Sequence, residues 1–375
     1  MLGASPRSFA FVLASLAPVV GCIADDLTAT DDVESALGSG SGSGSSCSIG
    51  SGSAAAPLTE TLDRPTADTR YLGLALDGGN NPWLVYLDNG NVAVAHKGTL
   101  SGLPWVTDTV DAASTVGNPA IAYGPTAAIT YFTSNLHLRY ARRSGTSWVI
   151  EEVATSTGPW WYQALAFDSA GTAHVAFWAS GSQLVHGVRG ATGWTFETAA
   201  TVPPNSGGQI ALAIAGTSVR IAYLETTHAE IHYVTRTSTG FTNQLARTVG
   251  VKYGVTSKQN ISLALDNSGT PHIGYRDDAK AEIHEVHLAG TTWIDESVDP
   301  NDAGWPVVAT DCAGGLHAFY DGYMFATRGP QWWGYRGIST EYGYADALVI
   351  DSTGRVHAAT FNQQPKRIRY MELSL

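Results

Sequence analysis

From Leu72 onward, short stretches of alternating apolar and polar residues recur along the chain, separated by turns rich in Gly, Asn, Asp and Ser. Alternation with a period of two indicates β-strands, and these turn residues end strands. Each repeat starts with an apolar strand that ends in an anchor residue, usually Asp. A Gly-containing turn, often a His, and two more strands follow. A Trp-led fourth strand closes the repeat, as in Trp293–Asp299. The pattern predicts four strands per repeat.

The anchor residue occurs seven times, at spacings of 40 to 51 residues. The anchors are Asp77, Gly124, Asp168, Ala215, Asp266, Asp311 and Asp351. A period of about 40–50 residues is typical of four-stranded propeller blades. We therefore expect an all-β protein, a seven-bladed β-propeller.

The seventh repeat has no Trp-led strand after Asp351. Residues 57–63, just before the first repeat, resemble Trp293–Asp299: both segments have a central Glu, then a hydroxyl residue, an aliphatic residue and Asp. We predict that residues 57–63 form the outer strand of the last blade. This pairing closes the ring and removes an open sheet edge. The predicted propeller then spans residues 57–375.

Histidines recur at two equivalent positions of the repeat. The first set is His174, His272, His317 and His357; the second is His137, His186, His232 and His284. Symmetry places the members of each set in different blades, so they cannot share one metal ion. We expect the first set to bond across the turn, including to the anchor Asp. The sequence predicts no metal and no cofactor.

The N-terminus has the pattern of an export signal. Arg7 precedes an apolar run from Phe9 to Val20, and the run leads to Gly21 and Cys22. This ending resembles the bacterial lipobox, which implies removal of residues 1–21 and acylation of Cys22. Acyl chains anchor a protein by burying CH₂ groups. Ile23 and Ala24 favour the outer membrane by the same resemblance. The alternative is an ordinary secretory signal with an incidental cysteine.

Residues 22–56 show no hydrophobic period. Acidic residues come first, and a Gly/Ser run follows from Gly38 to Ser53. Such a segment cannot bury enough apolar surface to fold, so we expect a disordered tether with a reach of roughly 30 Å. Cys47 and Cys312 either pair in an oxidising compartment or stay as two free thiols. We leave both alternatives open.

Charge limits the partners. The formal net charge is −12, and charged residues make up only 14% of the chain. Nucleic-acid binding needs a basic face, so we do not expect it. No apolar run of membrane-spanning length follows the N-terminus, so we expect membrane contact through the lipid only. We expect a monomer in the cell envelope.

Ligand chemistry is predicted where the repeat breaks. Loops between strands two and three share one face with the loops that join consecutive blades, and loops often carry binding residues. The predicted ligand contacts are Trp160, Trp161, Tyr162, Tyr253, Asp277, Asp302, Trp305, Glu341 and Tyr342. Aromatic rings beside carboxylates suit sugars, which stack an apolar face on a ring. The alternative is that these aromatics pack the seams between blades.

The repeat over residues 57–375 resembles those of secreted bacterial propellers of the sialidase-like (BNR) class, which includes propeller-fold polysaccharide lyases. In such lyases, His, Tyr and Arg side chains remove and return a proton beside a uronic carboxylate. The resemblance makes His228, Tyr253 and Arg276 candidate catalytic residues. Sialidase activity is not implied, because the Ser-x-Asp-x-Gly-x-x-Trp turn and an arginine triad are missing.

Two function classes remain. The first is a lipid-anchored surface propeller that binds a polysaccharide or a cell-envelope protein on its aromatic-rich loop face. The second is a secreted polysaccharide lyase or glycoside hydrolase acting in the propeller funnel. A hydrolase needs two carboxylates about 5–9 Å apart. The candidates are Glu225, Asp277, Asp302 and Glu341. Whether the chain is an enzyme stays open.

Overall fold

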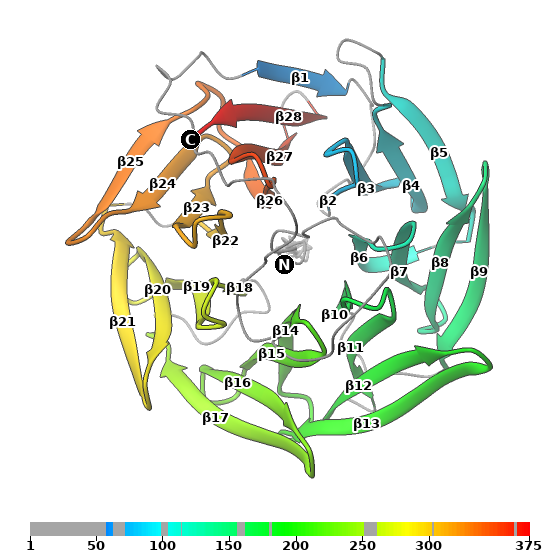
Figure 1. The fold of residues 1–375 in the computed structure, drawn as a ribbon, viewed down its shortest axis with the longest axis horizontal. Coiled ribbons are helices and arrows are strands. Elements are labelled where there is room, and N and C mark those ends of the chain that lie inside the picture. Colours follow the sequence, from blue (N-terminus) through cyan, green and yellow to red (C-terminus); the bar gives the residue numbers. More distant parts are fainter. Residues whose placement is uncertain are drawn as a thin grey trace, which may run out of the picture.

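The computed structural model describes residues 58–62, 72–98, 104–113, 115–155, 162–179, 182–250, 261–301, 304–363 and 366–375. These residues form 28 strands and no helix. The strands pair into seven four-stranded antiparallel sheets. The sheets stand as blades around a central axis (Figure 1). The predicted all-β, seven-bladed propeller is confirmed.

The first four blades follow the chain order. Blade 1 contains β2 (Leu72–Leu76), β3 (Pro82–Asp88), β4 (Asn91–His96) and β5 (Val106–Asp111). Blade 2 contains β6 (Thr115–Tyr123), β7 (Ala127–Thr133), β8 (Leu138–Ser144) and β9 (Ser147–Ala154). Blade 3 contains β10 (Gln163–Phe167), β11 (Ala173–Ala179), β12 (Gln183–Gly190) and β13 (Gly193–Thr201). Blade 4 contains β14 (Gly207–Ala215), β15 (Ser218–Glu225), β16 (Glu230–Thr237) and β17 (Gly240–Thr248).

The last three blades complete the ring. Blade 5 contains β18 (Ile261–Leu265), β19 (Pro271–Asp277), β20 (Glu282–Ala289) and β21 (Thr292–Asp299). Blade 6 contains β22 (Val307–Thr310), β23 (Leu316–Tyr320), β24 (Met324–Arg328) and β25 (Trp333–Gly337). Blade 7 contains β26 (Tyr344–Ile350), β27 (Arg355–Gln363), β28 (Lys366–Ser374) and the N-terminal β1 (Leu58–Leu62).

The ring is closed as the sequence predicts. Strand β1 pairs antiparallel with β28 at the outer edge of blade 7, with Leu58 opposite Glu372 and Leu62 opposite Ile368. Leu62 is buried in a hydrophobic cluster shared by blades 7 and 1, which includes Leu72 and Tyr370. The first and last strands of the domain are therefore hydrogen-bonded within one sheet, and the open edge is removed.

The core lies in the seams between blades. The innermost strands of neighbouring blades contact one another all the way round the ring. Second strands such as β11 are almost wholly buried, because blades cover both of their faces. Fourth strands such as β13 alternate between exposed and partly buried positions. This difference explains why the second strands read as continuous apolar runs and the fourth strands as mixed ones.

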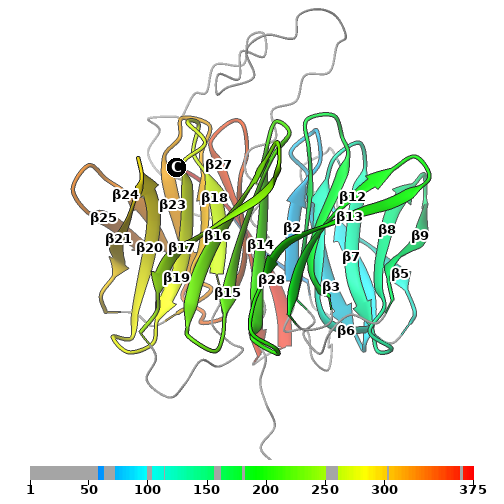
Figure 2. The same cartoon turned by 90° about the horizontal axis from the view of Figure 1, so that it is seen from below.

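Anchor carboxylates organise the turns between first and second strands. In blade 7, Asp351 Oδ1 accepts the N–H groups of Thr353 and Arg355, at 2.8 and 2.9 Å. Gly354, inside this turn, has φ of 78°, which glycine adopts without strain. The anchor carboxylates of blades 1, 3, 5 and 6 accept N–H groups at the same spacing. We call the face with these turns the turn face and the opposite one the loop face. Figure 2 shows the strands running between them.

The repeated histidines have the predicted structural role. Their Nε2 atoms lie 3.4, 3.7, 2.9 and 3.3 Å from the second oxygen of the anchor Asp in blades 3, 5, 6 and 7. The histidines are His174, His272, His317 and His357. In blades 3, 6 and 7 one carboxylate thus holds the turn with one oxygen and bonds the imidazole with the other. In blade 5 the distance of 3.7 Å is too long for a direct hydrogen bond.

Several predictions concern the N-terminal region. Cys22, the signal sequence and the tether lie outside the described residues, so those predictions stay open. Cys312 is disulfide-bonded. Its partner lies outside the described residues, and the alternative of a free thiol at Cys312 is wrong. In the described part of the chain, no helix is long and apolar enough to cross a bilayer.

Candidate functional site

Two of the predicted loop-face carboxylates hold turns. Glu225 ends β15 and is 2% exposed. Its two oxygens accept the N–H groups of Thr227 and His228 at 2.7 and 2.8 Å. Asp277 ends β19, is also 2% exposed, and accepts the N–H of Ala279 at 3.1 Å. Each carboxylate therefore has a structural role in its own loop, and the predicted ligand role of Asp277 stays a prediction.

No described contact joins the candidate lyase residues His228 and Arg276 to each other. His228 Nδ1 lies 2.8 Å from the Glu225 carboxylate in blade 4. Arg276 Nε in blade 5 lies 2.8 Å from Asp278, and its guanidinium stands 5.4 Å from the ring of Trp305. These partners are not shared, and Tyr253 lies outside the described residues. The proton-transfer set stays a prediction.

Glu341 belongs to a polar cluster at the blade 6–7 seam. Its carboxylate accepts hydrogen bonds from Arg367 and from Asn362, the latter at 2.9 Å. The buried guanidinium of Arg369 donates to Asn362 Oδ1 and to the backbone oxygen of Glu341, at 3.0 and 2.6 Å. These contacts fix the loop that enters blade 7.

Two acids of the loop face, Glu225 and Glu341, have pKa values below their ordinary values. Arg367 and its hydrogen bonds hold the pKa of Glu341 below its ordinary value. Burial raises the pKa of Glu225, but the N–H groups of the turn outweigh it and lower the pKa. A glycosidase acid needs a raised pKa. Neither Glu225 nor Glu341 is suited to that role.

The aromatic residues predicted to contact a ligand differ in their exposure. Tyr162 is 6% exposed and packs in the cluster between blades 3 and 4 with Trp178. It therefore has the seam-packing role that the sequence left open as the alternative. Tyr342 is 61% exposed, and its ring lies 6.3 Å from that of Tyr323. Trp160, Trp161, Tyr253 and Asp302 lie outside the described residues.

A second repeated feature ties the blades together at the outer rim. A basic side chain at the end of a third strand pairs with an acid on the fourth strand of the preceding blade. Arg143 bonds Asp108 at 2.7 Å, and Arg328 bonds Glu296 with two contacts of 2.9 and 2.6 Å. The other pairs are Lys97–Glu60, Arg189–Glu151 and Arg236–Glu197. Five seams share this arrangement, which we call the rim tie.

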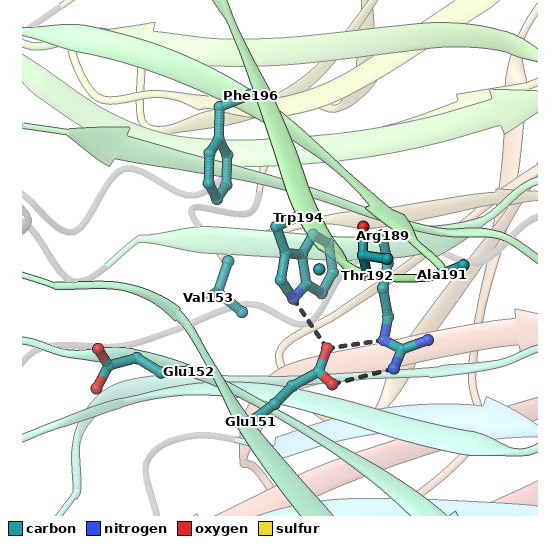
Figure 3. Close-up of a pocket in the computed structure, with 9 residues that line it drawn as sticks. Glu151, Glu152, Val153, Arg189, Ala191, Thr192, Trp194 and Phe196 are labelled. Atoms are coloured by element: carbon teal, nitrogen blue, oxygen red, sulfur yellow. Dashed lines mark hydrogen bonds and ion pairs between the residues drawn. The ribbon is translucent and has the colours of Figure 1, made fainter.

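A groove with a volume of about 480 Å³ opens beside the rim tie between blades 2 and 3. Arg189 Nε and Nη2 donate to the two oxygens of Glu151 at 2.7 and 3.0 Å, and Trp194 Nε1 donates to Glu151 at 2.9 Å. Figure 3 shows Trp194 and Arg189 converging on this carboxylate, with the ring of Phe196 to one side. Thr192, in the turn between β12 and β13, also lines the groove. The groove thus lies at the outer rim towards the turn face.

Glu151 and Arg189 stabilise each other's charged form in the groove. Partial burial raises the pKa of Glu151, but Arg189 and the Trp194 N–H outweigh it and lower the pKa below its ordinary value. The hydrogen bonds to Glu151 raise the pKa of Arg189. Both groups are charged at neutral pH. The groove combines a paired carboxylate and guanidinium with Phe196, which is 48% exposed.

The rim tie, which was not predicted, does leave a signal in the sequence. In blades 2, 3, 4 and 6 the basic residue stands five positions before the aromatic residue of the fourth strand, and where a blade carries the acid it stands three positions after that aromatic residue, as in Arg189, Trp194 and Glu197. The partners come from different blades, so the signal is visible only when neighbouring repeats are compared. At the blade 4–5 seam both positions lack charge, with Gln244 and Leu288.

Comparisons with known proteins support the fold. No family model and no curated protein sequence matches the chain. Among solved structures, an inactive virginiamycin B lyase from Staphylococcus aureus with quinupristin is 11% identical, with a TM-score of 0.58 over 85% of this chain and 99% of that one. AofleA from Arthrobotrys oligospora is 12% identical, with a TM-score of 0.50 over 82% and 87%. A six-bladed fungal lectin from Aleuria aurantia is 14% identical, with a TM-score of 0.47 over 71% and 94%. At these identities the likeness concerns the fold alone.

Proposed function

We propose that the chain is a lipid-anchored cell-surface propeller that binds a glycan in the rim groove between blades 2 and 3. One observation carries the proposal: an exposed aromatic ring stands beside a charged hydrogen-bonding pair in an open groove. A volume of about 480 Å³ lies within the range of small-molecule sites.

The groove has polar capacity left for sugar hydroxyls. Arg189 has five N–H donors, and Glu151 accepts two of them. A carboxylate offers about four acceptor positions, and Arg189 and Trp194 occupy three of those of Glu151. Hydroxyl groups both donate and accept, so a sugar can use the remaining positions of both groups. A hydrogen bond to a charged group is stronger than a neutral one.

The groove also has an apolar surface. Phe196 projects from β13 with 48% of its surface exposed, and its ring packs edge-on against Phe177 at 5.9 Å. This contact from within the blade fixes the ring, so little side-chain entropy is lost on binding. The C–H face of a pyranose can stack on such a ring while its hydroxyls reach Arg189. An aromatic platform and a charged pair together favour a sugar over a purely apolar ligand.

Anchoring belongs to the same proposal. The lipobox-like ending at Cys22 and the Gly/Ser run up to Ser53 support a lipid anchor followed by a spacer. A tether of this kind holds the propeller clear of a membrane, and its rim stays accessible to polysaccharide. We place the protein in the outer membrane on the same basis.

A glycan array tests the binding proposal. The full chain should bind a defined subset of glycans. Phe196→Ala should weaken that binding about tenfold, or about 1.4 kcal/mol. Tyr335→Ala is the matched control, because Tyr335 is the exposed aromatic at the equivalent position of blade 6 and is 51% exposed. Equal binding by wild type and Phe196→Ala, or no binding by wild type, would overturn the proposal.

A further inference from the structure

Blade 5 contains a buried cluster that is not explained by glycan binding. His272 on β19 and Glu285 and His287 on β20 are 4%, 0% and 8% exposed. Glu285 Oε1 lies 2.7 Å from His272 Nδ1, and Glu285 Oε2 lies 3.0 Å from His287 Nδ1. All three side chains offer a ligand atom within 4.8 Å of the other two. We infer that His272, Glu285 and His287 form a Zn²⁺ site within blade 5.

Comparison of equivalent positions in the repeated blades shows that blade 5 differs from the others. The first position, opposite the anchor turn, is a histidine in blades 3, 5, 6 and 7. At the position of Glu285 the other three blades have His186, Phe325 and Tyr370, and at the position of His287 they have Val188, Thr327 and Glu372. In those blades the histidine Nδ1 bonds a single neutral side chain, namely His186, Thr327 or Tyr370. Only blade 5 brings two imidazoles to one buried carboxylate, among the described residues.

The ligand set suits zinc. Two imidazole nitrogens and one carboxylate oxygen are common zinc ligands, with bonds of about 2.0–2.2 Å. Tetrahedral bonds of that length place ligand atoms roughly 3.4 Å apart. The observed separations of 2.7 and 3.0 Å therefore need to widen by about 0.7 and 0.4 Å to reach that spacing. Three protein ligands leave the fourth position for a water molecule.

Neighbouring groups support the required tautomer. A zinc-bound histidine usually directs its other ring N–H at a carboxylate or carbonyl. His272 Nε2 lies 3.7 Å from Asp266 Oδ2, on the side of the ring away from Glu285. A zinc ion held through Nδ1 of His272 and of His287 requires both rings to carry their hydrogen on Nε2. The ion then balances the buried negative charge of Glu285.

Metal analysis of the full chain tests the inference. After treatment with a chelator and dialysis against Zn²⁺, the protein should retain about one zinc per chain. Added zinc should also raise its Tm. His287→Thr removes one ligand and gives the residue that blade 6 carries at the same place, Thr327. It should lower zinc affinity on the order of a hundredfold. Retention of zinc by His287→Thr would overturn the inference, as would failure of the wild type to bind zinc.

Two further variants make the result specific. His186→Phe alters the equivalent pair in blade 3 to the residue of blade 6 and should leave zinc binding unchanged. His228→Gln removes the half-exposed imidazole of the Glu225, His228 and Glu230 group, the other metal-capable cluster among the described residues. Loss of zinc from His228→Gln with retention by His287→Thr would place the ion in blade 4 and contradict the inference. Glu285→Gln, of nearly equal size, provides a second test if His287→Thr folds poorly.

Discussion

Closure of the ring by β1 makes a quantitative prediction about Leu62. This residue comes from the N-terminal strand, yet it is 5% exposed within the cluster of blades 7 and 1. Leu62→Ala removes buried methyl groups and leaves the hydrogen bonds between β1 and β28 in place. If β1 is an integral strand of blade 7, the substitution must weaken the whole domain.

The magnitude follows from burial. A buried Leu→Ala change costs about 2–5 kcal/mol, and the lower part of that range applies at an outer strand, so we expect about 2–3 kcal/mol. For a domain of roughly 300 residues, an unfolding entropy of about 2.1 cal/mol/K per residue gives about 0.65 kcal/mol/K. The expected fall in Tm is therefore about 3–5 °C.

Differential scanning calorimetry measures this fall, and β1 itself supplies the control. Leu58 lies on the same strand but is 51% exposed. Leu58→Ala should change stability by less than about 0.5 kcal/mol and the Tm by less than about 1 °C. If both variants melted with the wild type, β1 would not be part of the cooperative unit, and the reasoning on closure would be wrong.

Three further predictions test other parts of the structure. Gln244→Glu together with Leu288→Arg should create the missing rim tie at the blade 4–5 seam. A double-mutant cycle measured by urea unfolding should then show a coupling energy of about 0.5 kcal/mol between the two substitutions. Strictly additive effects would contradict this. Burial raises the pKa of Asp351, but hydrogen bonds from His357, Thr353 and Arg355 outweigh it and lower the pKa to about 2. The stability that the Asp351 carboxylate contributes is therefore present above pH 3.8 and lost as the pH falls towards 2. Over this pH range the free energy of unfolding of the wild type should fall by about 2 kcal/mol more than that of Asp351→Asn. Equal falls in the two proteins would refute this. Peptide mapping without reduction should find Cys312 joined to Cys47 and Cys22 acylated; a Cys22–Cys312 bridge would exclude the lipid anchor.

The fold could be predicted because each blade repeats the same local chemistry. Anchor residues such as Asp168 and Asp266 hold their turns by contacts within five residues, so the pattern is visible in sequence. The outer strand of blade 7 was also predictable, because Glu60 stands where Glu296 stands in blade 5. Both glutamates make the rim tie to the next blade.

The site was less predictable, because it depends on contacts between blades. Glu225 and Asp277 end β15 and β19 just before irregular loops and look like ligand carboxylates, but they accept backbone N–H groups of their own turns. The groove beside Glu151 exists because Arg189 comes from the next blade and because Phe196 stays exposed. Similarly, His272 and Glu285 are 13 residues apart and meet only through the pairing of β19 with β20.

Isothermal titration calorimetry with the best glycan from the array tests the proposed binding site most directly. Three proteins are compared: the wild type, Phe196→Ala at the rim groove, and Trp160→Ala in the loop between blades 2 and 3. We predict that Phe196→Ala weakens binding about tenfold while Trp160→Ala binds like wild type. Loss of binding in Trp160→Ala with full binding in Phe196→Ala would move the site to the loop face and contradict the account.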